Sequence, residues 1–452
     1  MLKRAAVILA AGQGTRMRSS LPKVLHPVAG RAMVDWSIAL ARAVGCEEII
    51  VVCSPAGEAV QTHIEKTLGE GAIAIQDPPL GTGHAVLAAK DSLAGFEGEL
   101  VVLYADTPLI PSQAIEALFG ELQAGADVGV LGFDAADPGA YGRLIMTADG
   151  NLDAIVEAKE ATPDQLNVSF CNSGVMAASA DQMFELLGQV TNENAKGEYS
   201  LTDIVELANA AGGKCRAVAC DEADVLGVNS RVELAEAEAA FQTKTRNAFL
   251  VAGVTMTAPE TVYFSYDTEL ENDVTLEPHV VFGPCVTIRS GATVRAFSHL
   301  EGADVASDCT IGPYVRLRPG AVLEEGVKIG NFVEVKNTQM GPGAKASHLS
   351  YLGDGEIGAD ANIGAGTIFC NYDGFLKYKT TVGKGAFVGS NSSLVAPVTI
   401  GDGAFVGSGS VITKDVEANA LSVARGRQIS KSGWATQFRD KMAAIKAAKK
   451  KG

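Results

Sequence analysis

The sequence has no excess of basic charge, no closely paired cysteines and no long apolar run. Its formal net charge of −16 over 452 residues argues for solubility and against general nucleic-acid binding. The eight cysteines include no Cys-x-x-Cys pair, so we expect reduced thiols and a cytoplasmic protein rather than a disulfide framework. No segment approaches the length of a bilayer span, and we therefore expect no membrane insertion.

The start of the chain superficially resembles a signal peptide, because Lys3 and Arg4 precede an apolar run. That run, residues 5–11, is only minimally long and leads directly into a glycine motif. We therefore interpret it as a buried first strand.

Between residues 274 and 412 the sequence has a six-residue period. Aliphatic residues occupy every sixth position, and the register slips by one at Met340 and again at Ile357. This period matches neither a helix nor a simple strand and is typical of a left-handed parallel β-helix. Each coil buries too little alone, so many must stack. The longest unbroken register is Val305, Ile311, Leu317, Leu323, Ile329 and Val335.

Before the repeats, apolar strands alternate with amphipathic helices. The pattern predicts strands at residues 5–10, 48–52 and 100–104, and helices at residues 33–44 and 112–122. This alternation is typical of a doubly wound, Rossmann-like α/β domain that binds ligands at the carboxyl ends of its strands.

A glycine-rich loop follows the first strand and is close to two basic residues. Gly12 and Gly14 fit neither the Walker loop nor the Rossmann spacing. Arg16 and Lys23 lie in the same short stretch, and two cations beside a phosphate-binding loop suggest triphosphate chemistry. Asp106 directly follows the strand at 100–104 and is either a metal ligand or a turn cap.

The opening motif, residues 9–17 with Pro22 and Lys23, resembles that of the sugar-nucleotide pyrophosphorylases. Together with the β-helix, the whole chain resembles the bacterial family of bifunctional N-acetylglucosamine-1-phosphate uridylyltransferase / glucosamine-1-phosphate acetyltransferases. Further family motifs follow in order: Gln76, Gly81-Thr82-Gly83-His84-Ala85, Tyr141-Gly142-Arg143, Val156-Glu157, Asn172-Ser173-Gly174, Gly197-Glu198-Tyr199 and Gly227-Val228-Asn229.

The resemblance implies that the first half takes UTP and N-acetylglucosamine-1-phosphate. It places Mg²⁺ on Asp106 and Asn229, and the phosphates on Arg16 and Lys23. The chain departs from the family at Ala105, where a glycine is usual, and the extra methyl could alter nucleotide affinity. The other residues implied to bind UDP-N-acetylglucosamine are Leu9, Ala10, Ala11, Gly12, Gln76, Gly81, Thr82, Tyr104, Gly142, Glu157 and Asn172.

The later coils contain charges that a plain scaffold would not need. By the resemblance, His348 is the base that takes a proton from the amine of glucosamine-1-phosphate. We interpret Cys370 as a packing residue, because direct acetyl transfer needs no covalent intermediate. The implied sugar-phosphate ligands are Arg318, Lys336, Tyr351, Asn362 and Lys377, and the implied acetyl-CoA ligands are Ala365, Asn371, Tyr372, Ser390, Ser408 and Arg425.

We expect a pyrophosphorylase domain at residues 1–227, a linker helix at 228–249, a β-helix acetyltransferase domain at 250–428 and a C-terminal arm at 429–452. The resemblance implies a homotrimer that binds CoA between subunits, with the arm reaching a neighbour. The arm's lysines, 441, 446 and 449–451, would either bind CoA phosphates or only solubilise the tail. Two alternatives remain: another sugar nucleotidyltransferase with a regulatory β-helix, and a non-catalytic trimeric scaffold.

Overall fold

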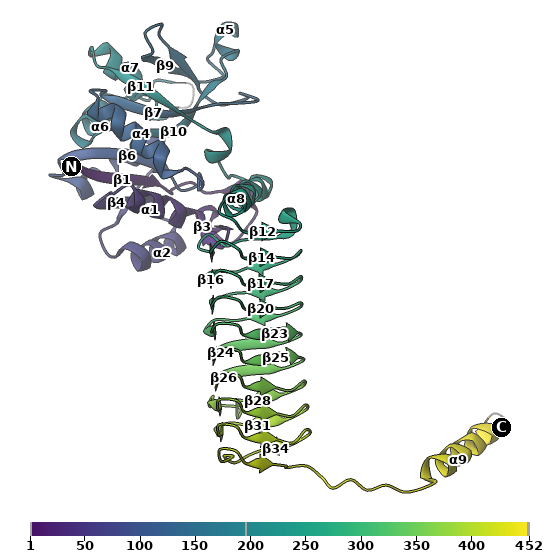
Figure 1. Ribbon diagram of the computed structural model, residues 1–452. Helices are drawn as coiled ribbons and strands as arrows, with labels where there is room; N and C mark the ends of the chain where they lie inside the picture. Colours follow the sequence, from purple (N-terminus) through teal and green to yellow (C-terminus); the bar gives the residue numbers. More distant parts are fainter. Residues whose placement is uncertain (1, 195–196, 450–452) are drawn as a thin grey trace. The chain divides into compact units, whose positions relative to one another are not determined.

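The computed structural model describes residues 2–194 and 197–449 and contains two compact units. The first unit comprises Met1–Val251 with Tyr263–Asp267, and the second comprises Ala252–Val262 with Thr268–Gly452. Figure 1 shows a layered α/β arrangement in the first and a stack of short strands in the second. The predicted roles of Lys450 and Lys451 lie outside the described residues.

The first unit is built on a mixed sheet, and the predicted Rossmann-like class is confirmed. Along the main order of strands, β10 runs antiparallel to β6 and β7, and the other neighbouring pairs are parallel. The hairpin β8 (Arg143–Met146) and β9 (Leu152–Val156) joins it beside β10. In sheet order the strands are β11 (Cys215–Cys220), β7 (Val128–Asp134), β10 (Phe170–Ser179), β6 (Gly98–Tyr104), β1 (Lys3–Leu9), β4 (Glu48–Cys53) and β5 (Ile73–Ile75).

Helices cover both faces of this sheet, which explains the continuous apolar run in β1. Ala5 and Val7 pack into one hydrophobic cluster, and Ala6 and Ile8 pack into the other. A central parallel strand buried on both sides carries no alternation, so the strand interpretation of the first residues is confirmed. The helices are α1 (Met33–Ala43), α2 (Glu58–Leu68), α3 (Thr82–Leu87), α4 (Ser112–Gln123), α5 (Pro163–Leu166), α6 (Ala180–Leu187) and α7 (Asp203–Ala210).

The long helix α8 (Arg231–Val251) packs as part of the first unit. Its Phe241 ring lies 5.5 Å from the ring of Trp36. Gln242 is almost fully buried, and its amide exchanges hydrogen bonds of 2.7 and 2.8 Å with the backbone of Phe264. A short ribbon, β2 (Pro27–Val28) and β3 (Arg31–Ala32), lies against the same helix.

The second unit is the predicted left-handed parallel β-helix, and its coils have three faces. Every aliphatic residue of the predicted register is buried. The first face is a ten-stranded sheet of β12 (Thr255–Met256), β14 (Thr275–Leu276), β17 (Thr293–Val294), β20 (Thr310–Ile311), β23 (Lys328–Asn331), β25 (Lys345–His348), β27 (Asn362–Ile363), β30 (Phe387–Val388), β33 (Phe405–Val406) and β35 (Leu421–Ser422).

The second and third faces form one fourteen-stranded sheet, because β24 (Glu334–Met340) and β26 (Tyr351–Ile357) run through both. The second face also contains β15 (Val281–Phe282), β18 (His299–Leu300), β21 (Arg316–Leu317), β28 (Ile368–Cys370), β31 (Ser393–Val395) and β34 (Val411–Ile412). The third contains β13 (Glu269–Leu270), β16 (Val286–Ile288), β19 (Ala303–Val305), β22 (Ala321–Leu323), β29 (Thr380–Val382) and β32 (Val398–Ile400).

Two features interrupt or follow the regular coils. Residues 371–379 form an insert hairpin between β28 and β29, closed by a bridge between Tyr372 and Lys377. The arm ends in α9 (Trp434–Lys449), in which every residue is exposed. Among the described residues, no helix is long and apolar enough to cross a membrane.

Candidate active sites on the two units

A cavity of about 320 Å³ opens at the carboxyl ends of β1 and β6. The structure brings ten of the predicted nucleotide and phosphate residues to its wall. Glu198, from the family motif at residues 197–199, also lines the cavity, although no specific role was predicted for it. The ten are Leu9, Ala10, Ala11, Gly12, Lys23, Gln76, Gly81, Thr82, Tyr104 and Asp106.

The glycine-rich loop leaves room for both a ligand and Lys23. A Cβ atom at Gly12 would meet nothing within 4 Å, so this backbone is open to a bound molecule. A Cβ at Gly14 would lie 2.5 Å from Cβ of Lys23, and Gly14 has a φ of +60°. Only glycine therefore allows the loop to pack closely on Lys23.

Lys23, Asp106 and Asn229 converge on one point of the cavity. The ammonium group of Lys23 donates to the carboxylate of Asp106 at 2.5 Å and to the amide oxygen of Asn229 at 3.1 Å. A carboxylate oxygen and an amide oxygen thus already share one cation. This donor set fits Mg²⁺, which takes oxygen ligands and keeps several waters. The described residues contain no group of three or more His, Cys, Asp or Glu that could hold a metal.

A loop from before α7 closes the wall of the cavity beside Gln76. The buried amide of Gln76 donates to the Gly81 carbonyl at 2.9 Å. A Cβ at Gly81 would lie 2.5 Å from the Tyr199 carbonyl oxygen. The Leu201 amide donates to the Thr82 hydroxyl at 3.0 Å. These contacts hold Gly81 and Thr82 against the segment that includes Glu198.

The predicted sugar residues form a second group next to this cavity. The Asn172 amide donates to the Gly142 carbonyl at 2.8 Å, and a Cβ at Gly142 would lie 3.5 Å from the Glu157 carboxylate. Tyr104 connects the two groups. It lines the cavity, and its ring also fills the space that a side chain at Gly174, close to Asn172, would need. Burial, then the negative charges of Asp106 and Glu157, raise the pKa of Tyr104, so its hydroxyl stays protonated.

Two residues of the first half lie differently from the rest. Arg16 is exposed and does not line the cavity, although its charge acts on Glu233, which accepts from the Asn229 amide at 2.8 Å. Ala105 is fully buried among the apolar residues below the cavity, so its methyl group does not narrow the nucleotide pocket.

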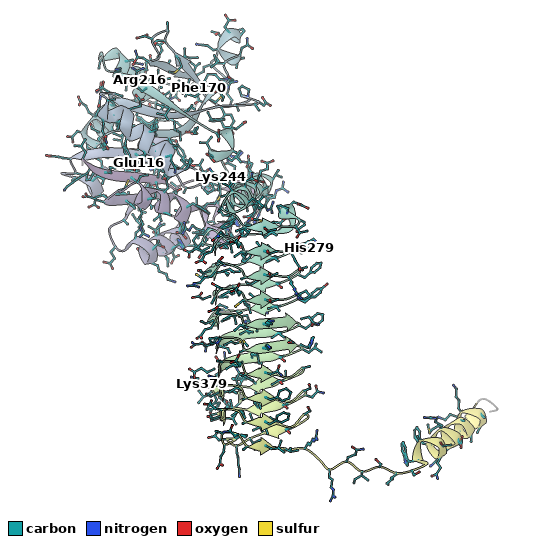
Figure 2. The ribbon with its side chains drawn as sticks, viewed as in Figure 1. Glu116, Phe170, Arg216, Lys244, His279 and Lys379 are labelled. Atoms are coloured by element: carbon teal, nitrogen blue, oxygen red, sulfur yellow. The ribbon has the colours of Figure 1, made fainter. Side chains whose placement is uncertain are left out.

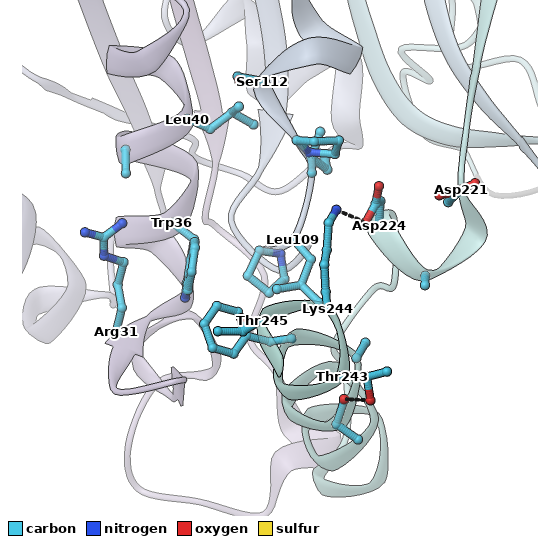
Figure 3. A pocket seen from close by; sticks show the side chains of 18 of the residues that line it. Arg31, Trp36, Leu40, Leu109, Ser112, Asp221, Asp224, Thr243, Lys244 and Thr245 are labelled. Carbon is cyan, nitrogen blue, oxygen red and sulfur yellow. Dashed lines mark hydrogen bonds and ion pairs between the residues drawn. The ribbon is translucent and has the colours of Figure 1, made fainter. Parts of the chain in front are cut away.

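A larger and more apolar groove, of about 810 Å³, lies between α1, α8 and the segment that follows β6. Trp36 and Leu109 contribute to its wall, and at one side Lys244 donates to Asp224 at 2.9 Å (Figure 3). It contains none of the predicted site residues.

On the second unit, His348 lies at the turn between the first and second faces. Its Nδ1 is 2.8 Å from the side-chain oxygen of Asn331, on the coil before it. An amide oxygen can only accept, so Nδ1 carries the proton and Nε2 keeps a free lone pair. His348 is exposed. Asn331 was not predicted as a site residue.

Four of the predicted acetyl-CoA residues continue this turn along successive coils. The Gly366 amide donates to the His348 carbonyl at 3.2 Å, which sets Ala365 directly below the histidine. Backbone hydrogen bonds link Ala365 to Asn391 and Ser390 to Gly409. Below them, the Arg425 guanidinium donates to the Ser408 carbonyl at 2.5 Å. The column Ala365, Ser390, Ser408 and Arg425 therefore leads away from His348.

Three predicted sugar-phosphate ligands, Arg318, Lys336 and Lys377, lie at the edge of the second face that is opposite His348. Arg318 donates to Glu334 at 2.8 Å, and this hydrogen bond raises the pKa of Arg318. The pKa of Lys336 is lowered, chiefly by its contact with the neighbouring Lys377. The Tyr351 hydroxyl reaches across the face to within 3.4 Å of the Asn371 amide nitrogen.

The structure does not bring all of the predicted acetyltransferase residues together on one chain. Asn362 lies on the first face, where it pairs with Lys345, whereas Lys336 lies on the second. Asn371 and Tyr372 lie in the insert hairpin, away from the column below His348. The side-chain contacts also reveal Asp354, a residue that had no predicted role.

Comparisons with known proteins follow the same division of the chain. Residues 6–194 match the MobA-like NTP transferase domain, and residues 379–414 match six repeats of the bacterial transferase hexapeptide. The bifunctional protein GlmU of Hyphomonas neptunium is 63% identical over 99% of this chain and 97% of its own length. The chain belongs to the GlmU family. Its members include those of Caulobacter vibrioides, 57% identical over 99% of this chain and 96% of theirs, and Roseobacter denitrificans, 51% identical over all of both chains.

As a GlmU-family member, the chain is a bifunctional transferase, with a uridylyltransferase domain followed by a hexapeptide acetyltransferase domain. Membership confirms the resemblance predicted from the motifs and excludes the scaffold alternative. The crystal structure of a UDP-glucose pyrophosphorylase complexed with UDP-glucose covers 54% of this chain and 100% of its own, at 21% identity. The TM-score of 0.42 is too low for this likeness to support a conclusion.

Proposed function

We propose that the two sites act in sequence to make UDP-N-acetylglucosamine. Residues 250–428 transfer an acetyl group from acetyl-CoA to glucosamine-1-phosphate. Residues 1–227 then transfer a uridylyl group from UTP to the resulting N-acetylglucosamine-1-phosphate. Both reactions take place in the cytoplasm, in keeping with eight cysteines of which none forms a disulfide.

The convergence of Lys23, Asp106 and Asn229 at the cavity carries the proposal for the first domain. A phosphate oxygen of the sugar attacks the α-phosphorus of UTP, a new P–O bond forms, and the bond to the leaving pyrophosphate breaks. No side-chain nucleophile is needed, so the residues align the reactants and neutralise charge. Gly142, Glu157 and Asn172 bind the sugar, and the glycine-rich loop binds the uridine side.

Asp106 and Asn229 would hold Mg²⁺, which offsets the charge of the triphosphate when it is bound. Lys23, now paired with Asp106, would then bind phosphate oxygens. Arg16 is exposed and would approach the same phosphates from the loop.

At the second site, the Asn331–His348 hydrogen bond supports a base at Nε2. The amine nitrogen of glucosamine-1-phosphate attacks the thioester carbonyl, a C–N bond forms and the C–S bond to CoA breaks. His348 accepts the amine proton. Arg318, Lys336 and Lys377 hold the sugar phosphate, and the column below His348 lies along the CoA.

We further propose a homotrimer that completes this second site. On one chain, His348 and the lysines lie at opposite edges of the second face, so a neighbouring copy would close the distance. The column His279, Phe297, Tyr314 and Phe332 supports association, because it is a stack of aromatic rings 4.8–5.2 Å apart along one turn. His279 stands at one end of this column (Figure 2). Phe375, at the tip of the insert hairpin, is 91% exposed.

One incubation tests both activities. The purified protein is given glucosamine-1-phosphate, acetyl-CoA, UTP and Mg²⁺, and the products are separated and identified by mass spectrometry. UDP-N-acetylglucosamine, CoA and pyrophosphate are expected, and omitting acetyl-CoA should stop all three. If the β-helix had only a regulatory role, no CoA would be released. Absence of CoA among the products would therefore overturn the acetyltransferase assignment.

A further inference from the structure

Asp354 lies at the turn between the second and third faces, where the chain takes a left-handed conformation. Its φ is +54°, and Asn337, on the coil before it, has a φ of +43°. Non-glycine residues adopt this region at a cost, although Asp and Asn tolerate it best. The position therefore supplies a carboxylate where glycine would be the easier residue for the backbone.

The carboxylate of Asp354 joins the coil before it to the base of the insert hairpin. One oxygen accepts from the Asn337 amide at 2.8 Å, and the other accepts from the Asn371 amide at 2.5 Å. Asn371 is almost fully buried and begins the hairpin that bears Lys377. Because an ionised carboxylate only accepts, both amide groups are fixed as donors. Through Asp354, two charge-assisted hydrogen bonds thus link the hairpin to the preceding coil.

The same carboxylate opposes the positive charge of two lysines. Burial alone would raise the pKa of Asp354, but the amides of Asn337 and Asn371 and the charges of Lys336 and Lys377 lower it. Lys336 has its pKa lowered by Lys377, by burial and by Arg318, while Asp354 acts in the opposite direction. Arg318 itself is paired with Glu334, and Tyr351 and Glu301 act on it.

We propose that Asp354 is a positioning residue of the sugar-phosphate site. It fixes the hairpin that presents Lys377, and it keeps Lys336 and Lys377 side by side as cations before the phosphate binds. This inference rests on the proposed function of the second domain, in which these lysines hold glucosamine-1-phosphate. The carboxylate itself does not touch the phosphate, since like charges would repel.

Asp354→Asn tests the proposal, because it keeps the shape of the side chain and removes its charge. Loss of a charge-assisted hydrogen bond is expected to raise the KM for glucosamine-1-phosphate by about tenfold to a hundredfold, with kcat changed only a few-fold. The fall of kcat/KM at alkaline pH should begin at lower pH than in the parent, because Lys336 loses its counter-charge. Uridylyl transfer should be unchanged, and thermal unfolding of the variant shows whether the β-helix is folded.

Asp360→Asn is the matched control, because Asp360 lies at the next turn of the coil and its backbone is also in the left-handed region, with a φ of +57°. It should leave the KM and the pH profile unchanged. Asp354→Glu keeps the charge, and it replaces Asp354→Asn as the test variant if Asp354→Asn does not fold. In Asp354→Glu, kcat/KM should begin to fall at the same alkaline pH as in the parent.

Calorimetry with glucosamine-1-phosphate alone separates the two proposals. If the parent does not bind it, the proposed substrate is wrong and the inference falls with it. If the parent binds and Asp354→Asn binds equally well, only the role of Asp354 is wrong. That role would also be wrong if kcat and thermal stability both fell in Asp354→Asn while the alkaline fall of kcat/KM stayed at the same pH. Such a result would indicate a residue needed only for folding.

Discussion

The ammonium nitrogen of Lys23 lies 2.5 Å from a carboxylate oxygen of Asp106, although 83 positions separate the two residues in the sequence. The same ammonium lies 3.1 Å from the side-chain oxygen of Asn229, 206 positions from Lys23. The ammonium group of Lys23 therefore occupies the point on which the two predicted metal ligands converge. We therefore expect the binding of Mg²⁺ and of UTP to be coupled, because Mg²⁺ would compete with Lys23 for these oxygens and the phosphates of UTP would attract the released ammonium group.

Asp106→Ala is expected to abolish uridylyl transfer and leave acetyl transfer unchanged. The change removes the carboxylate proposed to hold Mg²⁺ and leaves Lys23 without its ion pair. Each activity is measured separately, with N-acetylglucosamine-1-phosphate and UTP for one and glucosamine-1-phosphate and acetyl-CoA for the other. Loss of both activities in a folded variant would contradict the separation of the two sites.

Gly14→Ala should destabilise the first unit, whereas Gly12→Ala should not. A methyl group at Gly14 would clash with Lys23 and would stand at a φ of +60°, so we expect a loss of about 1 kcal/mol or more in unfolding free energy. Gly12 has open space around its Cα. Denaturant unfolding of the two variants measures the difference. Uridylyl transfer should also fall in Gly14→Ala, because Lys23 is displaced, and equal stability of both variants would refute the packing argument.

The protein is expected to sediment as a trimer whose acetyltransferase sites take residues from two chains. His348→Ala and Lys377→Ala should each be nearly inactive, but co-expression of the two should restore about a quarter of the parent activity when chains mix at random. Recovery follows because some interfaces then join an intact His348 to a neighbour's intact Lys377. A fully active monomer in sedimentation equilibrium, or trimers that show no recovery, would rule out shared sites.

His348→Ala should lower acetyl transfer by roughly two to four orders of magnitude, the usual contribution of a positioned general base. Binding of glucosamine-1-phosphate should change little, because Arg318, Lys336 and Lys377 are the residues proposed to hold the phosphate. A turnover within a few-fold of the parent would instead indicate a surface histidine without a catalytic role.

Much of the fold could be predicted from the sequence because its signals are local. In the β-helix, each coil repeats one buried aliphatic at the same spacing, so residues such as Ile311 and Leu317 show the period without any knowledge of distant contacts. The strand at β1 was equally clear, since burial on both faces requires an unbroken apolar run. Motif order was sufficient to predict the family, and ten of the predicted residues line one cavity.

The tertiary structure alone decided which of these residues meet. Lys377 lies in the insert hairpin, outside the six-residue register, and no spacing in the sequence reveals that it contacts Lys336. Asp354 showed no signal either, because an aspartate at a turn is common and its importance depends on two amides from other coils. The sequence determined which chemical groups the protein has, through local periodicity and motifs. Folding decided their partners, because contacts between distant residues depend on where each turn points its side chains.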